Sequence, residues 1–314
     1  MYDIAVIGNS PVDALTHVTE DFLEEQNLRK GDFNQVDPTQ YAKIVEACFV
    51  EALESGGSTA NTAWTMAQLG CKVGFIGRVG ADEAGSHFFE DMHKADVPMP
   101  APDASAKTMQ IYCLITPDGQ RTFVSEGVTA PLSAPWVSEE MIQESNWLLI
   151  EGYMMLDQMD AVDQAILLAR KHGTKIAMTL SAVFVVQAAY GSITSEIMKG
   201  MDMIIANDEE MEALLQAAED DGTSNELVKK ICDTKRVITH GPNGATFVEG
   251  TEKVFKDSLH VDAPLDTTGG GDAFAAGFLA AYIRDASLEE SLTQGHKLGR
   301  NVISQIGGRL KNVA

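Results

Sequence analysis

The sequence is poor in several residue types, and each shortage excludes a class of protein. Its four cysteines, Cys48, Cys71, Cys113 and Cys232, stand far apart without a CxxC pair, which argues against a disulfide framework and favours reduced thiols. No run of about 18 apolar residues occurs, and the N-terminus lacks a basic segment followed by a long apolar one. We therefore expect a cytoplasmic protein without a membrane partner.

Basic side chains are also scarce. There are 23 of them against 46 acidic ones, which gives a formal net charge of −23 over 314 residues. Such a field repels polyphosphate backbones, so we expect no nucleic-acid partner. Hydrophobic residues make up 45% of the chain and charged residues 22%, an ordinary balance for a globular protein. The composition leaves a monomer and a homodimer open.

Short apolar runs rich in β-branched residues recur and alternate with segments of helix length. The segment Asp160–His172 has apolar residues on one helical face and is followed by Gly173, a typical helix stop. This alternation predicts one α/β domain over residues 1–314, with a mostly parallel sheet between two helical layers. The expected strands are Ile4–Ile7, Lys72–Ile76, Trp147–Ile150, Lys175–Thr179, Met203–Ala206 and Arg236–Thr239.

Two stretches break this alternation. Residues from about 14 to 41 are polar and contain turn signals at Lys30–Asp32 and Asp37–Pro38. Residues 108–124 have the pattern of two strands joined by a turn at Thr116–Gly119. We predict that both stretches form a small β lid, inserted into the domain, that covers a site on the main sheet.

The strongest chemical pattern is a run of three glycines, Gly269–Gly271, before a segment of small and apolar residues that predicts a buried helix. Glycines let backbone N–H groups approach a ligand closely, and a helix start directs free N–H groups and positive charge at one point. Asp272, in the first turn, is positioned to accept a proton from an attacking hydroxyl. The alternative is a flexible loop in which Asp272 only stabilises the helix end.

The segment Asp266-Thr267-Thr268-Gly269-Gly270-Gly271-Asp272 resembles the Asp-Thr-x-Gly-Ala-Gly-Asp motif of the ribokinase-like (PfkB) family of carbohydrate and nucleoside kinases. Gly270 replaces the usual alanine. The resemblance implies a three-layer ribokinase-like fold, ATP and Mg²⁺ as cofactors, and Asp272 as catalytic base. It also implies that Gly269, Gly270 and Gly271 form an anion hole and that Asp266 is a structural or cation-orienting residue. A requirement for a monovalent cation is left open.

Other segments match the family in the same order along the chain. Gly56-Gly57-Ser58-Thr59-Ala60-Asn61 resembles the family's diglycine substrate motif; the alternative is a loop whose Ser58 or Thr59 caps the next helix. Arg121, in the lid, either reaches the substrate or phosphates or is a surface residue. Without the resemblance Asp13 is a plain loop carboxylate. With it, the acceptor-binding residues are Asn9, Asp13, Gly56, Gly57, Ser58, Asn61 and Arg121.

The nucleotide side has two further matches. Asn207-Asp208-Glu209-Glu210 resembles the family's Asn-x-x-Glu motif, in which Glu210 organises water around Mg²⁺; an acidic first helical turn is the other interpretation. Thr239-His240-Gly241-Pro242-Asn243-Gly244 resembles the family's nucleotide-side turn and on its own is a hairpin loop. The resemblance thus assigns ATP binding to Asn207, Thr239, Gly241, Gly244 and Thr268, and metal binding to Glu210.

The matching stretches run from Gly8 to about Gly308 and are most similar to the adenosine kinase branch, for example at Asp118–Thr122 and Leu180–Phe184. Where that branch has aromatic residues able to stack on a purine, this chain has Tyr153 followed by Met154. The expected reaction is transfer of the γ-phosphoryl group of ATP to a primary hydroxyl of an adenosine-like nucleoside or a sugar. The alternatives are a ribose, fructose or ketodeoxygluconate kinase, and a non-catalytic nucleotide- or sugar-binding regulator of the same fold.

Overall fold

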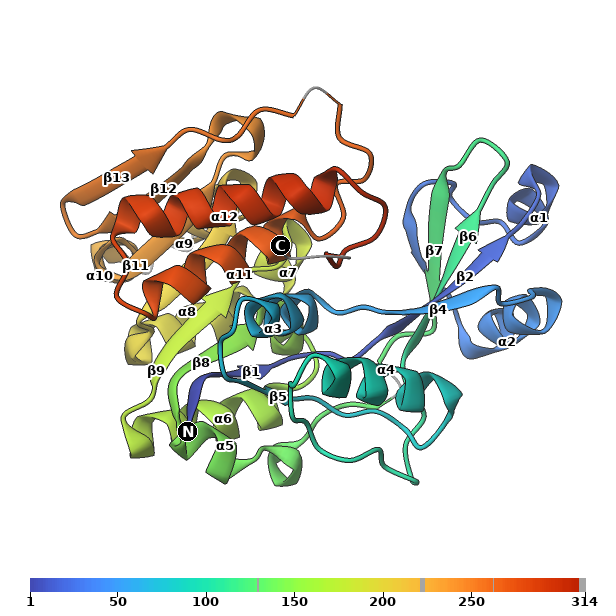
Figure 1. The fold of residues 1–314 in the computed structure, drawn as a ribbon, viewed down its shortest axis with the longest axis horizontal. Helices are drawn as coiled ribbons and strands as arrows, with labels where there is room; N and C mark the ends of the chain where they lie inside the picture. The colour runs from blue at the N-terminus through green and yellow to red at the C-terminus, as the bar shows by residue number, and fades with distance from the viewer. Residues whose placement is uncertain (129, 221–223, 262, 311–314) are drawn as a thin grey trace.

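The computed structural model describes residues 1–128, 130–220, 224–261 and 263–310, and this part of the chain contains two sheets (Figure 1). The larger sheet has the order β13-β12-β11-β10-β9-β8-β1-β5. Neighbouring strands from β5 to β11 are parallel, whereas β12 and β13 are antiparallel additions. The predicted mostly parallel α/β fold is confirmed. The strands are β1 (Tyr2–Ile7), β5 (Val73–Ile76), β8 (Ser145–Glu151), β9 (Lys175–Thr179), β10 (Met203–Asn207), β11 (Lys235–Thr239), β12 (Ala245–Glu249) and β13 (Glu252–Lys256).

Successive residues of the central strands enter two different cores, because side chains alternate across a strand. In β1, Ala5 and Ile7 belong to one core and Ile4 and Val6 to the other. Burial on both faces explains why these strands are continuous apolar runs. The first core is covered by α5 (Glu139–Gln143), α6 (Met159–His172), α7 (Val183–Ala188), α8 (Tyr190–Gly200), α9 (Asp208–Asp220) and α10 (Ser224–Asp233), and the second by α3 (Ser58–Gln68), α4 (Glu83–Lys94), α11 (Gly270–Tyr282) and α12 (Leu288–Ile303).

Helix α6 ends where the sequence predicted. Gly173 adopts the left-handed conformation, with φ 74°, and its N–H bonds back to the last turn. A glycine at this position ends a helix at little steric cost. The described residues also contain three short 3₁₀ segments in connections: η1 (Ala134–Trp136), η2 (Gly152–Met155) and η3 (Gly241–Asn243).

The smaller sheet has the order β3-β7-β6-β2-β4 and lies on the right of Figure 1. Helices α1 (Glu20–Glu25) and α2 (Pro38–Ala47) cover one of its faces, where Leu23 and Ile44 pack in one core with Leu114. The predicted lid segments, residues 14–41 and 108–124, contribute to this sheet. The sheet begins before residue 14, because β2 starts at Val12, and it also includes β4, whose sequence has no alternating apolar pattern. Its strands are β2 (Val12–His17), β3 (Phe33–Gln35), β4 (Ala52–Ser55), β6 (Gln110–Ile115) and β7 (Arg121–Ser125).

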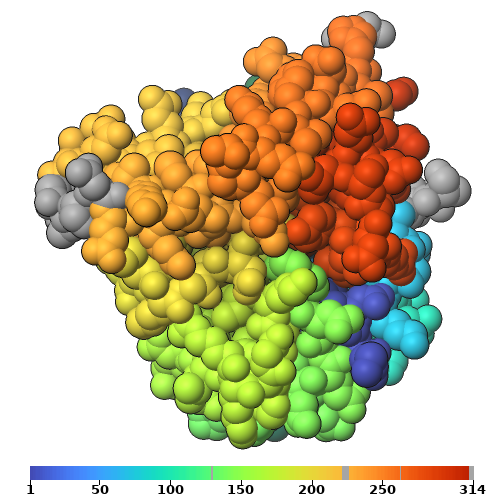
Figure 2. All heavy atoms as spheres, turned by 90° about the vertical axis from the view of Figure 1, so that its left-hand side faces the viewer, coloured from blue at the N-terminus to red at the C-terminus, as the bar shows by residue number. Residues whose placement is uncertain are grey.

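The face of the molecule remote from the smaller sheet is formed mainly by the middle and C-terminal parts of the chain, as the green-to-red colours of Figure 2 show. The smaller sheet therefore extends from one end of the larger one and leaves this face uncovered. All four cysteines are free of disulfide bonds, as expected. Among the residues that the structure describes, no helix has the length and apolarity needed to cross a bilayer.

Candidate active site

The carboxyl ends of the parallel strands meet at one edge of the larger sheet, where open α/β sheets bind their ligands. A cavity of about 810 Å³ lies here, bounded also by the smaller sheet and by residues 306–310. This cavity brings together predicted residues from both ends of the chain. The predicted site residues that line it are Asn9, Asp13, Gly56, Gly57, Ser58, Asn61, Thr268 and Asp272.

The start of α11 has no side-chain cap; the N–H of Gly270, one of the predicted anion donors, bonds to the carbonyl oxygen of Thr267 at 3.2 Å. Gly269 is left-handed, with φ 73°, and a Cβ there would lie 2.3 Å from the carbonyl oxygen of Gly308. The first backbone bond of the helix runs from the N–H of Ala273 to Gly269, so the N–H groups of Gly271 and Asp272 point out of the helix end. A Cβ on Gly271 would meet no atom within 4 Å. The arrangement provides room and donors for an anion.

The carboxylate of Asp272 is held by α3 rather than by its own helix. Ser58 Oγ donates to Oδ1 at 2.6 Å and Asn61 Nδ2 donates to Oδ2 at 3.2 Å. Burial raises the pKa of Asp272 to about 6, although these two hydrogen bonds and the charge of Arg309 oppose the shift. The interpretation as a simple helix-end carboxylate is therefore wrong. A buried carboxylate with this pKa suits a general base near neutral pH.

Helix α3 also begins without a side-chain cap. Its cap residue is Gly57, with φ 93°, where a Cβ would come within 2.6 Å of a backbone oxygen. The hydroxyls of Ser58 and Thr59 bond instead to the carboxylates of Asp272 and Glu151. The alternative in which either hydroxyl caps this helix is therefore wrong, because both groups are used to join α3 to other elements.

Glu151, at the end of β8, is a buried carboxylate that the sequence reasoning missed. It accepts hydrogen bonds from the N–H and Oγ1 of Thr59 at 3.2 and 2.8 Å and from Asn9 Nδ2 at 3.0 Å. Burial nevertheless raises its pKa. Asn9 Oδ1 accepts from Gln158 Nε2 at 2.8 Å, so the amide of Asn9 braces the cavity wall. The signal for Glu151 was its position directly after the apolar run Trp147–Ile150.

Asp13 lies in β2 of the smaller sheet and not in a loop after β1 as expected. It pairs across the sheet with Glu54 of β4, and both side chains line the cavity. Burial and the nearby charge of Glu54 raise the pKa of Asp13 to about 7, while Arg121 and Arg309 oppose the shift. This end of the cavity thus offers carboxylate acceptors for hydroxyl groups.

Arg121 of β7 joins the smaller sheet to the glycine turn. Its guanidinium lies 3.4 Å from Asp266 Oδ2, and its side chain is only 22% exposed, which argues against a plain surface role. Asp266 in turn accepts from the N–H groups of Thr268 at 2.9 Å and Gly307 at 3.0 Å. Asp266 therefore organises the loop before α11 and the segment after α12.

Asn207 and Glu210 form a reciprocal cap at the start of α9, outside the lining of the cavity. Glu210 accepts from the backbone N–H and Nδ2 of Asn207 at 3.1 and 2.9 Å, and its own N–H donates to Asn207 Oδ1 at 2.8 Å. Burial raises the pKa of Glu210, and the charges of Glu209 and Asp272 add to this shift. The segment is thus an acidic first turn of α9, as the second interpretation predicted, with Glu210 held by Asn207.

The turn between β11 and β12 contains the other predicted nucleotide-side residues. Thr239 lies beside Asn207 in the parallel pair of β11 and β10, so both lie at the same edge of the sheet. Gly241 and Gly244 have φ of 55° and 117°, and a Cβ on Gly244 would lie 2.4 Å from the oxygen of Lys256. These residues form a hairpin turn next to the cap of α9, separate from the acceptor side.

Residues 31–313 match the model of the pfkB family carbohydrate kinases. The chain belongs to this family. It is 27% identical to the adenosine kinase of Saccharomyces cerevisiae, over 97% of this chain and 95% of that protein. It is 28% identical to the ATP-dependent ribose-1-phosphate kinase of Halopiger xanaduensis, over 81% of this chain and 82% of that protein. The solved adenosine kinase of Sinorhizobium meliloti is 29% identical and superimposes with a TM-score of 0.84, covering 99% of this chain and 96% of that one.

These comparisons confirm the predicted family and the ribokinase-like fold. The chain is a pfkB-family kinase, and the family includes enzymes that act on nucleosides and enzymes that act on sugars.

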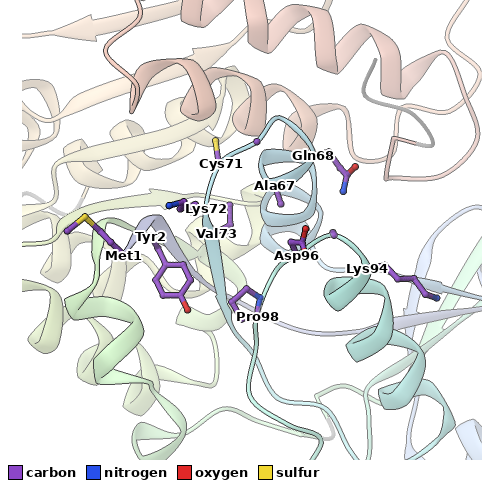
Figure 3. Close-up of a pocket in the computed structure, with 12 residues that line it drawn as sticks. Met1, Tyr2, Ala67, Gln68, Cys71, Lys72, Val73, Lys94, Asp96 and Pro98 are labelled. Atoms are coloured by element: carbon purple, nitrogen blue, oxygen red, sulfur yellow. The ribbon is translucent and has the colours of Figure 1, made fainter.

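A second pocket of this pfkB kinase, about 650 Å³ in volume, lies at the opposite edge of the sheet, near the starts of β1 and β5 (Figure 3). Its lining includes Lys72, Lys94 and Asp96. Helices α3 and α4 both end here, so the pocket faces the negative ends of their dipoles. It lacks the helix start and the held carboxylate that the larger cavity has.

Proposed function

We propose that this chain is an ATP-dependent kinase that phosphorylates the primary hydroxyl of a neutral, adenosine-like nucleoside, with Asp272 as general base. The observation that carries this proposal is the position of Asp272 in the cavity. Its carboxylate lies at the open start of α11, beside free backbone donors, and is held by two side chains of α3.

The ring pair Tyr153 and Phe184 supports a nucleoside as acceptor. The ring centroids lie 5.9 Å apart at an interplanar angle of 51°, and both residues line the cavity that contains Asp272. Phe184 is 57% exposed, so it offers an apolar surface that a flat base could cover. Aromatic faces bind such rings by stacking, whereas a sugar alone would leave these surfaces in water.

The charges around the cavity support a neutral acceptor. Asp13 and Glu54 lie side by side at one end, and they would repel an acidic or phosphorylated acceptor. The two nearby guanidinium groups are already paired, Arg121 with Asp266 and Arg309 with Asp91. The carboxylates suit hydroxyl groups instead, because ionised carboxylates accept hydrogen bonds.

In the proposed reaction, Asp272 takes the proton of the acceptor hydroxyl as the hydroxyl oxygen attacks the γ-phosphorus. The new oxygen–phosphorus bond forms while the bond to the β-phosphate oxygen breaks, and ADP leaves. The free N–H groups of Gly271 and Asp272 would stabilise charge on the transferring group. Because burial raises the pKa of Asp272 only to about 6, the base is ionised at neutral pH.

The residues present fit Mg²⁺ as the accompanying ion. Mg²⁺ prefers oxygen ligands and keeps several waters, and Asn207 and Glu210 provide amide and carboxylate oxygens at the edge of the sheet. Among the described residues, no group of three or more His, Cys, Asp or Glu side chains is arranged to hold a metal, as suits an ion that arrives with a nucleotide. When bound, Mg²⁺ neutralises phosphate charge.

We further propose that the smaller sheet is a lid. It contributes Asp13, Glu54 and Phe123 to the cavity, and Arg121 anchors it to the loop before α11 through Asp266. A covered cavity excludes water, which would otherwise compete with the acceptor for the phosphoryl group.

An acceptor panel tests the proposal. Adenosine, inosine, ribose, fructose and ketodeoxygluconate are each offered with ATP and Mg²⁺, and ADP release is measured, with Asp272→Asn as the blank. We expect the highest kcat/KM for adenosine or inosine. A higher value for a free sugar would make the protein a sugar kinase. Binding of adenosine and ATP without ADP release would make it a non-catalytic regulator.

The variant Phe184→Leu separates the two acceptor classes further. It should raise KM for adenosine about tenfold, on the scale of a lost stacking contact, and leave KM for ribose unchanged. An equal effect on both acceptors would remove the ring pair from acceptor recognition.

A further inference from the structure

A chain of three polar side chains runs from the C-terminal segment to the proposed base. Arg309 Nε donates to Asn61 Oδ1 at 2.8 Å, and Asn61 Nδ2 donates to Asp272 Oδ2 at 3.2 Å. We infer that Arg309 is a positioning residue, which fixes the amide of Asn61 so that its NH₂ group faces the carboxylate of Asp272. The inference deepens the proposed function and rests on it for its kinetic readout.

Arg309 is itself held on several sides. Its side chain is 12% exposed and forms an ion pair with Asp91 of α4. Its guanidinium carbon lies 5.7 Å from the centre of the Phe88 ring, and a weaker contact of 3.5 Å joins it to the carbonyl oxygen of Gly56. Because the guanidinium is fixed by α4 and by the loop before α3, it presents Nε to Asn61 in a defined direction.

The orientation of the Asn61 amide follows from the chemistry of its two neighbours. An amide accepts hydrogen bonds at its oxygen and donates them at its nitrogen, whereas a guanidinium only donates and a carboxylate only accepts. The reverse orientation would set NH₂ against the N–H of Arg309 and the carbonyl oxygen against Asp272. Since Asn61 is only 7% exposed, water could not make up the two lost bonds.

The orientation matters because it determines how easily Asp272 loses its proton. A donated N–H stabilises the ionised carboxylate and opposes the effect of burial, as the hydrogen bonds from Ser58 and Asn61 and the charge of Arg309 do here. The charge of Asp272 also interacts with three other titratable groups, which are Glu151 of β8, Tyr153 of η2 and Glu210 of α9. If Arg309 is lost, the Asn61 amide is free to turn its oxygen to Asp272, and the base then stays protonated to higher pH.

The pH dependence of kcat/KM for Arg309→Met and Arg309→Lys tests this role. In Arg309→Met we expect the acidic limb to move up by about one pH unit, so that kcat/KM falls about fivefold at pH 6, where the native base is half ionised, and recovers at pH 9. Arg309→Lys should restore the original limb, because an ammonium also donates to Asn61 Oδ1. A limb that does not move in Arg309→Met would overturn the inference.

A second variant separates positioning from charge. In the background Asn61→Leu, where no amide remains to be oriented, Arg309→Met should shift the limb by less than about a third of its shift in the native background. An undiminished shift would show that Arg309 acts only through its charge on Asp272 or Asp13, and the positioning role would be rejected.

Arg78 supplies a matched control. Its side chain is 17% exposed, lies 2.6 Å from Asp103 and stacks over the ring of Trp136, but it lies outside the cavity. Arg78→Met should lower the thermal midpoint without moving the pH limb. If it moves the limb as far as Arg309→Met does, the effect is a general consequence of losing a buried guanidinium and the inference fails.

A measurement that does not depend on turnover tests the inference separately from the proposed function. The ¹³C resonance of the Asp272 carboxyl, titrated in the free full-length protein, should have its midpoint near pH 6 and move upward in Arg309→Met. If Arg309→Met does not fold, Arg309→Leu, which likewise has no donor, is titrated in its place. An unmoved resonance rejects the inference even if the kinase assignment holds, whereas a moved one in a protein without kinase activity rejects only the assignment.

Discussion

Helices α9 and α11 both begin at the same end of the molecule with acidic residues in the first turn, but the two carboxylates have different partners. Both carboxylate oxygens of Glu210 accept hydrogen bonds from Asn207, at the start of its own helix. Those of Asp272 accept from Ser58 and Asn61 of α3, far away in the sequence. Glu210 therefore completes a helix end, while Asp272 belongs to a surface shared by two elements.

This difference shows that an acidic first turn does not by itself define a site. A carboxylate that its own helix satisfies contributes mainly to stability. Burial raises the pKa of both carboxylates, but of the two only Asp272 lines the cavity, where an acceptor hydroxyl can reach it, and proton transfer needs both properties. Variants of the two residues should therefore affect different quantities.

The largest effect is expected for Asp272→Asn. Loss of the base should lower kcat at least about 100-fold, in the range of general base catalysis. The thermal midpoint should stay unchanged or rise, because a buried charge is removed. Steady-state kinetics with calorimetric measurement of ATP binding provide the check; a variant with near-native kcat would show that Asp272 is not the base.

Glu210→Ala should give a smaller loss of activity and a clear loss of stability. Without the reciprocal cap, α9 loses about 1 kcal/mol, which lowers the thermal midpoint by about 2–4 °C. We also expect kcat to fall about tenfold and half-saturation to need more Mg²⁺, since Glu210 would orient the water around the ion.

Glu209→Ala is the matched control, because Glu209 is exposed in the same helical turn and its substitution removes the same charge. It should change neither the midpoint nor the Mg²⁺ requirement. Equal effects of the two variants would mean that the charge of this turn, and not the cap, is responsible.

The pH dependence of activity and stability follows from two carboxylates of the cavity whose pKa values are raised. Because burial raises the pKa of Asp272 to about 6 and that of Asp13 to about 7, kcat/KM should fall as the pH drops below 7. The contribution of these two carboxylates to folding stability changes with pH in the opposite direction. A raised pKa stabilises the folded chain below the ordinary value of 3.8, and this contribution is lost as the pH rises through 6 and 7.

Asp13→Asn tests that sign directly. It should raise the thermal midpoint relative to the native protein by about 2 °C at pH 8 and by less at pH 5, since the like-charge contact with Glu54 disappears. Thermal scans at the two pH values give the comparison. An equal stabilisation at pH 5 and pH 8 would show that Asp13 ionises normally in the folded protein, because it would then be charged at both pH values.

The smallest effect is expected at Gly270, where the family motif has alanine. A Cβ there would lie 3.0 Å from Ile303 Cγ2, a contact that a slight shift of the side chain relieves, so kcat of Gly270→Ala should change less than about threefold.

Gly271→Val, which meets open space, should fold but lose activity because its side chain occupies the region in front of the N–H groups. Native activity of Gly271→Val would place the anion elsewhere.

Much of the fold and part of the site followed from the sequence alone. The six parallel strands of the larger sheet and α6 were predicted because their sequence patterns are local, and Gly173 ended the helix where a left-handed residue was needed. The glycine turn before Asp272 was also predictable, because consecutive residues of the sequence indicate both the close backbone approach and the start of a helix.

Only the tertiary structure decided what holds the proposed base. Asn61 is separated by 211 residues from Asp272 and by 248 from Arg309, and no local pattern records such a contact. The hydroxyl of Ser58 could equally have capped its own helix, and Asp13 could have lain in a loop. The tertiary structure decides between these outcomes, because each polar group that is buried at the cavity needs a hydrogen-bond partner. Those partners come from elements that are distant in the sequence.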